Sequence, residues 1–277
     1  MAHRKSPEHR GRIIRASIES TASPRQLWNA WADPKRLAQW FPDRAEGQAV
    51  EGGTLTWLFD RFGYALPYEV LSAVPGEHLV LTGMIPGRPR FYLEIDIASA
   101  GGMTTLTLTN SGFLDKTGWD DEYEGIVSGW TMALALLKLF AERYYDKTRA
   151  QFFAMRPASY EYDELLAHFR NAGKLQAWLT RDGGIGDPGD AYELVLGNGE
   201  RVSGRVLAVT GWEVQLSWDE IGGALALKGF AMGQGRAVCV HGSSWDLSTA
   251  RALELERQFG DALDRLAAAL SADRVPL

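Results

Sequence analysis

The sequence predicts an α+β protein made of two tandem domains. Each domain is expected to be a curved antiparallel sheet wrapped around a long C-terminal helix, with two short helices after the first strand. Three observations lead to this fold class: an internal repeat, several runs in which apolar and polar residues alternate, and a long amphipathic helix at the end of each half. The 277 residues are enough for two domains of ordinary size.

The repeat is clearest in "LWNAWADPKRLAQWF", residues 27–41, which is matched by "LLAHFRNAGKLQAWL", residues 165–179. All large apolar positions stay apolar, whereas the polar positions between them vary. Core packing tolerates such exchanges, and recognition of a cation by an aromatic cage does not. We therefore interpret the segment as a helix pair that closes one end of the sheet. Trp40 is retained as Trp178, and for this pair we expect an indole hydrogen bond.

The first half begins with a strand, "RIIRASIE", whose alternate apolar residues share one face. Ser23 then caps a helix that has Pro24 at its first position, where a missing N–H costs nothing. Asp33 and Pro34 end this helix and open the second one, because aspartate caps a helix and proline fits its first turn.

Runs with period-two alternation follow, as expected for strands with one buried and one solvated face. Their inward-facing residues are Leu55, Trp57, Phe59, Tyr64, Leu66, Tyr68, Val70, Phe91, Leu93, Ile95, Ile97, Leu106 and Leu108. The segments 74–78 and 100–102 are turn signals between neighbouring strands. A helix over roughly 119–144 closes the half, with an apolar stripe that includes Tyr123 and Trp130.

The second half repeats this order with shorter loops. "AQFFAMRP" is a candidate first strand, and a hairpin turns at Asn198-Gly199. Three further strands and a closing helix follow, so each copy contains one strand, a helix pair, five strands and a long helix. We predict a disordered tail over residues 1–12, a first domain over 13–146 and a second domain over 147–277.

The net charge and the cysteine content argue against several classes of partner and site. The net charge of -6 argues against nucleic acid as a partner. Cys239 is the single cysteine, which excludes an intrachain disulfide and a thiolate metal cluster. The histidines show no metal-ligand spacing, so we expect neither a metal nor a cofactor. No apolar stretch reaches membrane-spanning length and no leader-like segment opens the chain, so we expect a cytoplasmic protein without membrane insertion.

Several segments match the motifs of one family. They are "LWNAWADPKRLAQW", the Gly-Gly strand entry "EGGTLTWLF", "YEVLSAVPGEHLVLTG", "LTLTNSGF", and Gly129-Trp130 followed by "ALALLKL". Together they resemble the helix-grip fold of the START/Bet v-like (SRPBCC) superfamily, in particular the branch named after the activator of the ATPase of the ninety-kilodalton heat-shock protein. The resemblance covers roughly residues 13–144. The second half keeps only the scaffold, so we interpret it as a degenerate copy.

The resemblance implies a deep cavity between the sheet and the long helix that takes a small apolar or amphipathic ligand. Superfamily relatives include lipid carriers, hormone receptors and polyketide aromatase/cyclases. In the second domain, small residues such as Gly204 and Ala208 face a helix rich in alanine and leucine, and we expect a packed interior.

The candidate ligand-binding residues are the inward-facing aromatic residues of the first domain and one carboxylate beside them. They are Trp57, Phe59, Tyr64, Tyr68, Phe91, Tyr123, Glu124 and Trp130. Such residues either fill the core or line a pocket with apolar walls and few polar groups. The tyrosines favour a pocket, because a buried phenol needs a hydrogen-bond partner. Glu124 lies in the acidic run "DDEYE", where it either compensates the helix dipole or forms a polar handle at the cavity mouth.

The leading functional hypothesis is non-catalytic binding of a small hydrophobic or amphipathic molecule in the first domain. One alternative is a cofactor-free cyclase, aromatase or hydrolase in which tyrosines and Glu124 act as acid and base; no motif assigns a catalytic residue. The other alternative, contact with a chaperone ATPase, follows from the family resemblance alone. The residues predict neither the identity of the ligand nor the oligomeric state.

Overall fold

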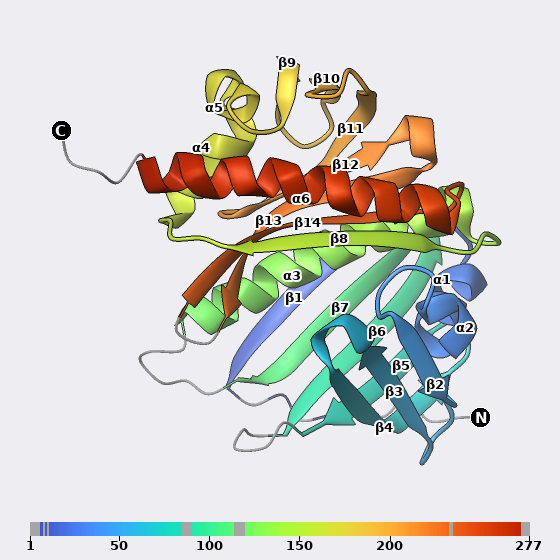
Figure 1. Ribbon diagram of the computed structural model, residues 1–277. Helices are drawn as coiled ribbons and strands as arrows, with labels where there is room; N and C mark the ends of the chain where they lie inside the picture. Colours follow the sequence, from blue (N-terminus) through green and yellow to red (C-terminus); the bar gives the residue numbers. More distant parts are fainter. Residues whose placement is uncertain are drawn as a thin grey trace. The chain divides into compact units, whose positions relative to one another are not determined.

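The computed structural model describes residues 6, 7, 9, 11–84, 90–113, 120–232 and 235–272, with the backbone alone for 120–122 and 231–232. The chain divides into two compact units, Met1–Lys147 and Thr148–Leu277 (Figure 1). The predicted tail over 1–12 lies largely outside the described residues. Of its described members, Arg12 begins the first strand.

The first unit has the following elements: β1 (Arg12–Ser20), α1 (Pro24–Ala32), α2 (Pro34–Leu37), β2 (Arg44–Gly47), β3 (Thr54–Phe59), a 3-10 segment (Asp60–Phe62), β4 (Tyr64–Val74), β5 (His78–Gly83), β6 (Phe91–Ala100), β7 (Met103–Phe113), α3 (Asp120–Leu139) and a π-helical segment (Phe140–Tyr144). The second unit has these: β8 (Ala150–Pro157), α4 (Tyr162–Arg170), α5 (Ala172–Gln176), β9 (Thr180–Gly184), β10 (Ala191–Leu196), β11 (Arg201–Val209), β12 (Glu213–Trp218), a 3-10 segment (Asp219–Ile221), β13 (Gly223–Met232), β14 (Gly235–Ser244) and α6 (Thr249–Ala272).

The two sheets have the same topology. The strand order is β1-β7-β6-β5-β4-β3-β2 in the first unit and β8-β14-β13-β12-β11-β10-β9 in the second, and neighbouring strands run antiparallel (Figure 1). The long helix packs along the first strand in both units, α3 on β1 and α6 on β8. The predicted fold class, two tandem helix-grip domains, is therefore confirmed.

Each sheet has one strand more than the sequence predicted. The additional strands, β2 and β9, lie at the free edge and pair with a single neighbour. Their sequences, "RAEG" and "TRDGG", carry charges and glycine instead of alternating apolar residues. Because an edge strand need not bury a face, hydrophobic periodicity does not reveal it.

The helix pair is confirmed in both units. The Ser23 side chain accepts a hydrogen bond from the Gln26 backbone N–H, and the Gln26 side-chain oxygen accepts one from the Ser23 backbone N–H. These two bonds form a capping box. The predicted indole hydrogen bonds are also present. Trp40 Nε1 donates to the Ala30 carbonyl at 2.8 Å, and Trp178 Nε1 donates to the His168 carbonyl at 3.0 Å.

The helix that ends the first unit corrects one expectation. The segment Tyr123–Tyr144 is long and apolar enough to cross a membrane by length and composition, with a mean hydropathy of 1.3. The sequence-based expectation that no stretch reaches this length was wrong. The same property is common in the core helices of soluble proteins, and Leu134, Leu137 and Phe140 of this segment are buried.

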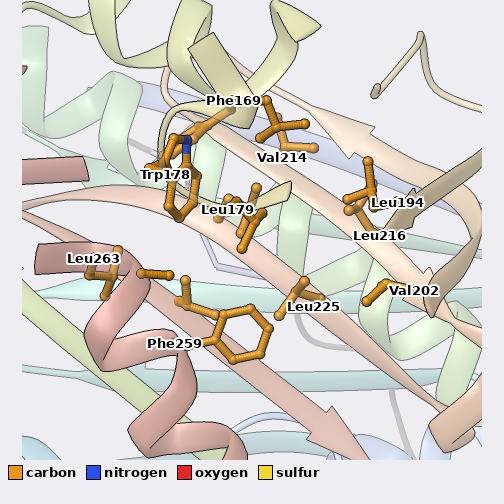
Figure 2. Packing of buried hydrophobic residues seen from close by; sticks show 14 of the residues in the cluster. Phe169, Trp178, Leu179, Leu194, Val202, Val214, Leu216, Leu225, Phe259 and Leu263 are labelled. Atoms are coloured by element: carbon orange, nitrogen blue, oxygen red, sulfur yellow. The ribbon is translucent and has the colours of Figure 1, made fainter. Parts of the chain in front are cut away.

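A continuous hydrophobic core fills the second unit. Figure 2 shows side chains from α4, from the sheet and from α6 facing one another, among them Phe169, Leu216 and Phe259. Phe259 stacks on Phe152 with ring centroids 5.5 Å apart, and Trp218 meets Phe259 edge-on at 6.2 Å. The interior of this domain is therefore made of interlocking apolar side chains.

Candidate ligand-binding site

The inner face of the first sheet brings three predicted residues together. Trp57 of β3 and Tyr68 of β4 have ring centroids 4.4 Å apart, and Tyr68 meets Phe91 of β6 edge-on at 5.6 Å. Phe91 lies across from Gly83 of β5, where an added Cβ would come within 2.7 Å of the Phe91 ring. Glycine at this position therefore lets the Phe91 ring lie flat over the neighbouring strand.

Residues from the helix side complete the aromatic surface. Phe41, which follows α2, has its ring 5.2 Å from Trp57, 5.7 Å from Trp130 and 5.8 Å from Phe59. Trp31 of α1 lies 6.1 Å from Trp57 and 6.0 Å from Trp130. The sequence assigned Trp31 and Phe41 to packing alone. The structure shows that they join the predicted strand residues to the predicted helix residue Trp130.

These side chains form one connected set, which we name the aromatic network: Trp31, Trp40, Phe41, Trp57, Phe59, Tyr64, Tyr68, Phe91 and Trp130. Its tryptophans are buried, Phe41, Phe59 and Phe91 are half-buried, and Tyr64 is 48% exposed. The network thus runs from the surface into the interior of the domain, as an apolar ligand site requires.

Trp130 is held in place by an inward-facing amide. Its Nε1 donates to Asn110 Oδ1 at 3.0 Å, and Asn110 Nδ2 donates to the Tyr92 carbonyl at 2.9 Å. This chain of hydrogen bonds fixes α3 against β6 and β7. It also uses the single indole N–H of Trp130.

Two indole nitrogens of the network lack a partner within the described residues. The buried Nε1 atoms of Trp57 and Trp31 have no acceptor there. Burial, with a smaller contribution from Tyr64, raises the pKa of Tyr68 above its usual range, so the phenol stays neutral. Leaving buried donors unpaired costs roughly 1–3 kcal/mol each.

Two predicted residues lie apart from the network. The Tyr123 hydroxyl donates to the Ile13 carbonyl at 2.9 Å, and the guanidinium of Arg12 lies 3.9 Å from the centre of the Tyr123 ring. Glu124 is exposed. The structure therefore does not bring Glu124 together with Tyr64 or Tyr68, as an acid–base pair would need.

The second domain has a groove that the sequence did not predict. It measures about 630 Å³ and is lined by Trp178, Leu196, Phe259 and three arginines, Arg181, Arg257 and Arg265, among others. Arg265 Nε donates to the Trp178 carbonyl at 3.1 Å, and Arg257 reaches Asp261 at 3.5 Å. The lining is more polar than the aromatic network and lies at the edge of the hydrophobic core.

The outer face of the first sheet carries side chains that could hold a metal ion. The ligand atoms of His78, Glu94 and Asp96 all lie within 4.8 Å of one another. These residues are separated in sequence and meet only because β5 and β6 pair. Sequence spacing therefore did not reveal them.

Comparison with known proteins agrees with this architecture. The model of the family described as "Activator of Hsp90 ATPase homolog 1-like protein" matches residues 21–142. No curated protein matches the chain.

Solved structures in the comparison match either about half of this chain or nearly all of it. CalU16 from Micromonospora echinospora is 24% identical, with a TM-score of 0.39, over 46% of this chain and 73% of its own. DynU16, from the dynemicin biosynthetic locus, is 18% identical with a TM-score of 0.42, over 95% of this chain and 100% of its own. The di-domain ARO/CYC protein BexL is 10% identical with a TM-score of 0.42, over 96% and 100%. Similarities at this level carry no conclusion about activity.

Proposed function

We propose that the N-terminal domain, whose residues 21–142 match the model of the activator of Hsp90 ATPase homolog 1-like family, binds a small hydrophobic or amphipathic molecule. The proposed site is the aromatic network, with Trp57, Tyr68 and Phe91 as its inner wall and Phe59 and Tyr64 toward solvent.

One observation supports this proposal above the others. The buried Trp57 Nε1 atom has no acceptor in the described part of the chain, and its ring lies 4.4 Å from that of Tyr68. A buried donor without a partner is costly in a core whose only task is packing. A ligand with an acceptor at this position would satisfy it.

The chemistry of the site defines the class of ligand. Nine aromatic side chains in contact favour a flat, largely apolar molecule that stacks on rings or meets their edges. Trp57 Nε1 offers a donor only, and the neutral Tyr68 hydroxyl offers a donor and an acceptor. We infer a ligand with one carbonyl or hydroxyl group on an aromatic or polycyclic body.

Binding without catalysis fits the described residues better than an acid–base enzyme. The ionisable groups of the aromatic network are Tyr64 and Tyr68, and the pKa of Tyr68 is raised by burial, which disfavours a role as a base near neutral pH. Glu124, the other proposed acid–base group, is exposed. Contact with a chaperone rests on the family description, with no residue of the structure to support it.

Native mass spectrometry of the full chain tests this function. Protein purified without detergent is incubated with a panel of hydroxylated and carbonyl-bearing polycyclic aromatics. We expect one molecule bound per chain, and loss of that adduct in the Trp57→Ala variant. If no member of the panel binds, or if Trp57→Ala binds as well as the parent while keeping its fold by circular dichroism, the proposal is wrong.

A further inference from the structure

The outer face of the first sheet holds a buried set of histidines and carboxylates, which we name the His–carboxylate cluster: His9, His78, Glu94 and Asp96. His78 of β5 pairs across the strands with Asp96 of β6, and Glu94 pairs with the neighbouring Val80. His78 is fully buried, and Glu94 is 4% exposed. The aromatic network lies on the opposite face of the same strands, so the two sites are independent.

Glu94 is a buried carboxylate with unusual partners. Its Oε1 accepts from the Ser6 hydroxyl at 2.5 Å, and its Oε2 lies 2.8 Å from His9 Nε2. Within the described residues no lysine or arginine pairs with it. Buried charges in proteins are normally paired with an opposite charge or coordinate a metal ion.

His78 is oriented as metal-binding histidines are. Its Nδ1 lies 3.0 Å from Asp96 Oδ1, a contact that favours the tautomer with the ring proton on Nδ1. In that tautomer Nε2 presents a lone pair toward Glu94 Oε1, 3.8 Å away, and it has no hydrogen-bond partner within the described residues. A lone pair facing a carboxylate is repulsive. A cation between the two atoms resolves this arrangement.

The N-terminal segment supplies a second histidine in the same orientation. His9 Nδ1 lies 2.8 Å from the Ser111 hydroxyl on β7, and its Nε2 points at Glu94. The side chain of His9 is 17% exposed, so this side of the cluster borders the solvent. Both imidazoles thus have Nδ1 occupied by an oxygen and Nε2 directed at one carboxylate.

The second domain shows that the fold does not need this cluster. In the corresponding strand pair, Glu213 of β12 faces Lys228 of β13, an ordinary pair of opposite charges. The position that corresponds to Glu94, two residues before Lys228, is Ala226. The first domain therefore carries an additional buried carboxylate where the second copy has only a methyl group.

We propose that the His–carboxylate cluster binds one divalent transition-metal ion of the zinc class. His78 Nε2 and the Glu94 carboxylate, which already lie close together, are two ligands, and His9 Nε2, which contacts the other oxygen of Glu94, moves in as the third. Asp96 acts as a positioning residue through His78 Nδ1, in the manner of carboxylate–histidine–zinc triads. Ligand atoms of a tetrahedral site with bonds of about 2.1 Å lie about 3.4 Å apart. In such a site the 3.8 Å between His78 Nε2 and Glu94 Oε1 would contract, and the 2.8 Å between His9 Nε2 and Glu94 Oε2 would lengthen. The ion would link His9 to β5 and β6.

The test uses the full chain without a histidine tag, stripped with a chelator and titrated with zinc chloride by calorimetry. Cobalt chloride, followed by its visible absorption, reports the ligand geometry. We expect one ion per chain, and a loss of affinity of about 10-fold or more in His9→Gln and in Glu94→Gln. Asp96→Asn should weaken binding by about 10- to 100-fold.

His241→Gln is the matched control. His241 lies on β14 of the second domain and bonds Gln151 at 3.1 Å, outside the cluster, so this variant should bind zinc as the parent does. Glu94→Gln keeps the size of the side chain, and His9→Gln changes a side chain that is partly exposed. Circular dichroism checks that both variants fold. The proposal is overturned if the parent shows no saturable 1:1 binding, or if the folded His9→Gln and Glu94→Gln variants both retain full affinity.

Discussion

Three buried tyrosines differ in what their hydroxyl groups bind. Tyr160 donates to the Ala237 carbonyl at 3.0 Å and accepts from the Phe230 N–H, and Tyr192 donates to the Ser217 carbonyl at 2.5 Å. Tyr68 has no such partner among the described residues. Burial raises the pKa of all three, that of Tyr160 to about 12. The tyrosine that makes no such bond to a described residue belongs to the domain with the aromatic network.

Phenylalanine substitutions separate a packing role from a binding role. Tyr192→Phe should lower the free energy of unfolding by about 1 kcal/mol, because a buried carbonyl loses its donor. Tyr68→Phe should leave it unchanged or raise it, because no protein hydrogen bond is lost. Urea unfolding followed by tryptophan fluorescence measures both. An equal loss in the two variants would show that Tyr68 has a protein partner.

Cys239 is a packed thiol. Burial raises its pKa to about 12, so the reactive thiolate is scarce in the native state. We expect no reaction with a disulfide reagent at pH 8 unless denaturant is added, and one equivalent in its presence. The thiol ionises near pH 9 in the unfolded state, and its pKa is about 12 in the native state. Between these two pH values the native state binds more protons than the unfolded state. The free energy of unfolding therefore falls as the pH rises from 9 to 12. Rapid labelling of the native protein would contradict this expectation.

At the scale of the elements, the two helix pairs share one structural device. The last four carbonyls of a helix have no partner within it. In α1 one of these, at Ala30, receives the indole N–H of Trp40, and in α4 the His168 carbonyl receives that of Trp178. This explains why tryptophan is retained here while the other apolar positions vary.

Substitution of Trp40 and of Trp178 should lower the stability of the first and the second domain by similar amounts. Trp40→Phe and Trp178→Phe should each destabilise their domain by roughly 1–3 kcal/mol, through lost volume and an unpaired carbonyl. Trp31→Phe is the control, since Trp31 Nε1 has no acceptor among the described atoms and Phe169 stands at the matching position. Thermal unfolding of the three variants measures the difference. A larger shift for Trp31→Phe than for Trp40→Phe would refute the role of the hydrogen bond.

Hydrophobic periodicity in the sequence predicted the helices and strands that bury one face, and it missed the strands that do not. The strands with alternating residues and the long helices bury apolar stripes, so their pattern is visible in the sequence. The edge strands β2 and β9 bury little and leave no such signal. In the site, strand parity placed Trp57, Tyr68 and Phe91 on one face. It did not reveal that the start of α3, with Tyr123 and Glu124, lies away from them, because a helical stripe does not specify its partner along the helix.

At the scale of the whole molecule, the two copies distribute their aromatic rings differently. In the first domain Tyr68 pairs with Leu55 and Phe91 with Gly83. In the second domain the corresponding pairs are Gly204 with Tyr192 and Gly223 with Trp218. In both places the larger ring has moved to the partner strand, from β4 to the counterpart of β3 and from β6 to the counterpart of β5. The same fold thus supports a continuous hydrophobic core in one copy and the aromatic network in the other.

The proposed division of roles makes the first domain the binding domain. Tyr68→Phe removes one hydroxyl from the proposed site, and Tyr192→Phe removes one from the core of the second domain. The loss of one hydrogen bond to a ligand is worth about 1 kcal/mol, which corresponds to about a five-fold change in affinity. A ligand held by the aromatic network should therefore bind more weakly to Tyr68→Phe than to Tyr192→Phe.

The most direct measurement is the dissociation constant of 2-naphthol, an aromatic body with one hydroxyl group, for the full chain and for these two variants. Quenching of tryptophan fluorescence reports it, because the network contains Trp31, Trp40, Trp57 and Trp130. We predict saturable binding of one molecule per chain, about five-fold weaker in Tyr68→Phe and unchanged in Tyr192→Phe. Absence of saturable binding, or equal affinity of Tyr68→Phe and the parent, would contradict the account.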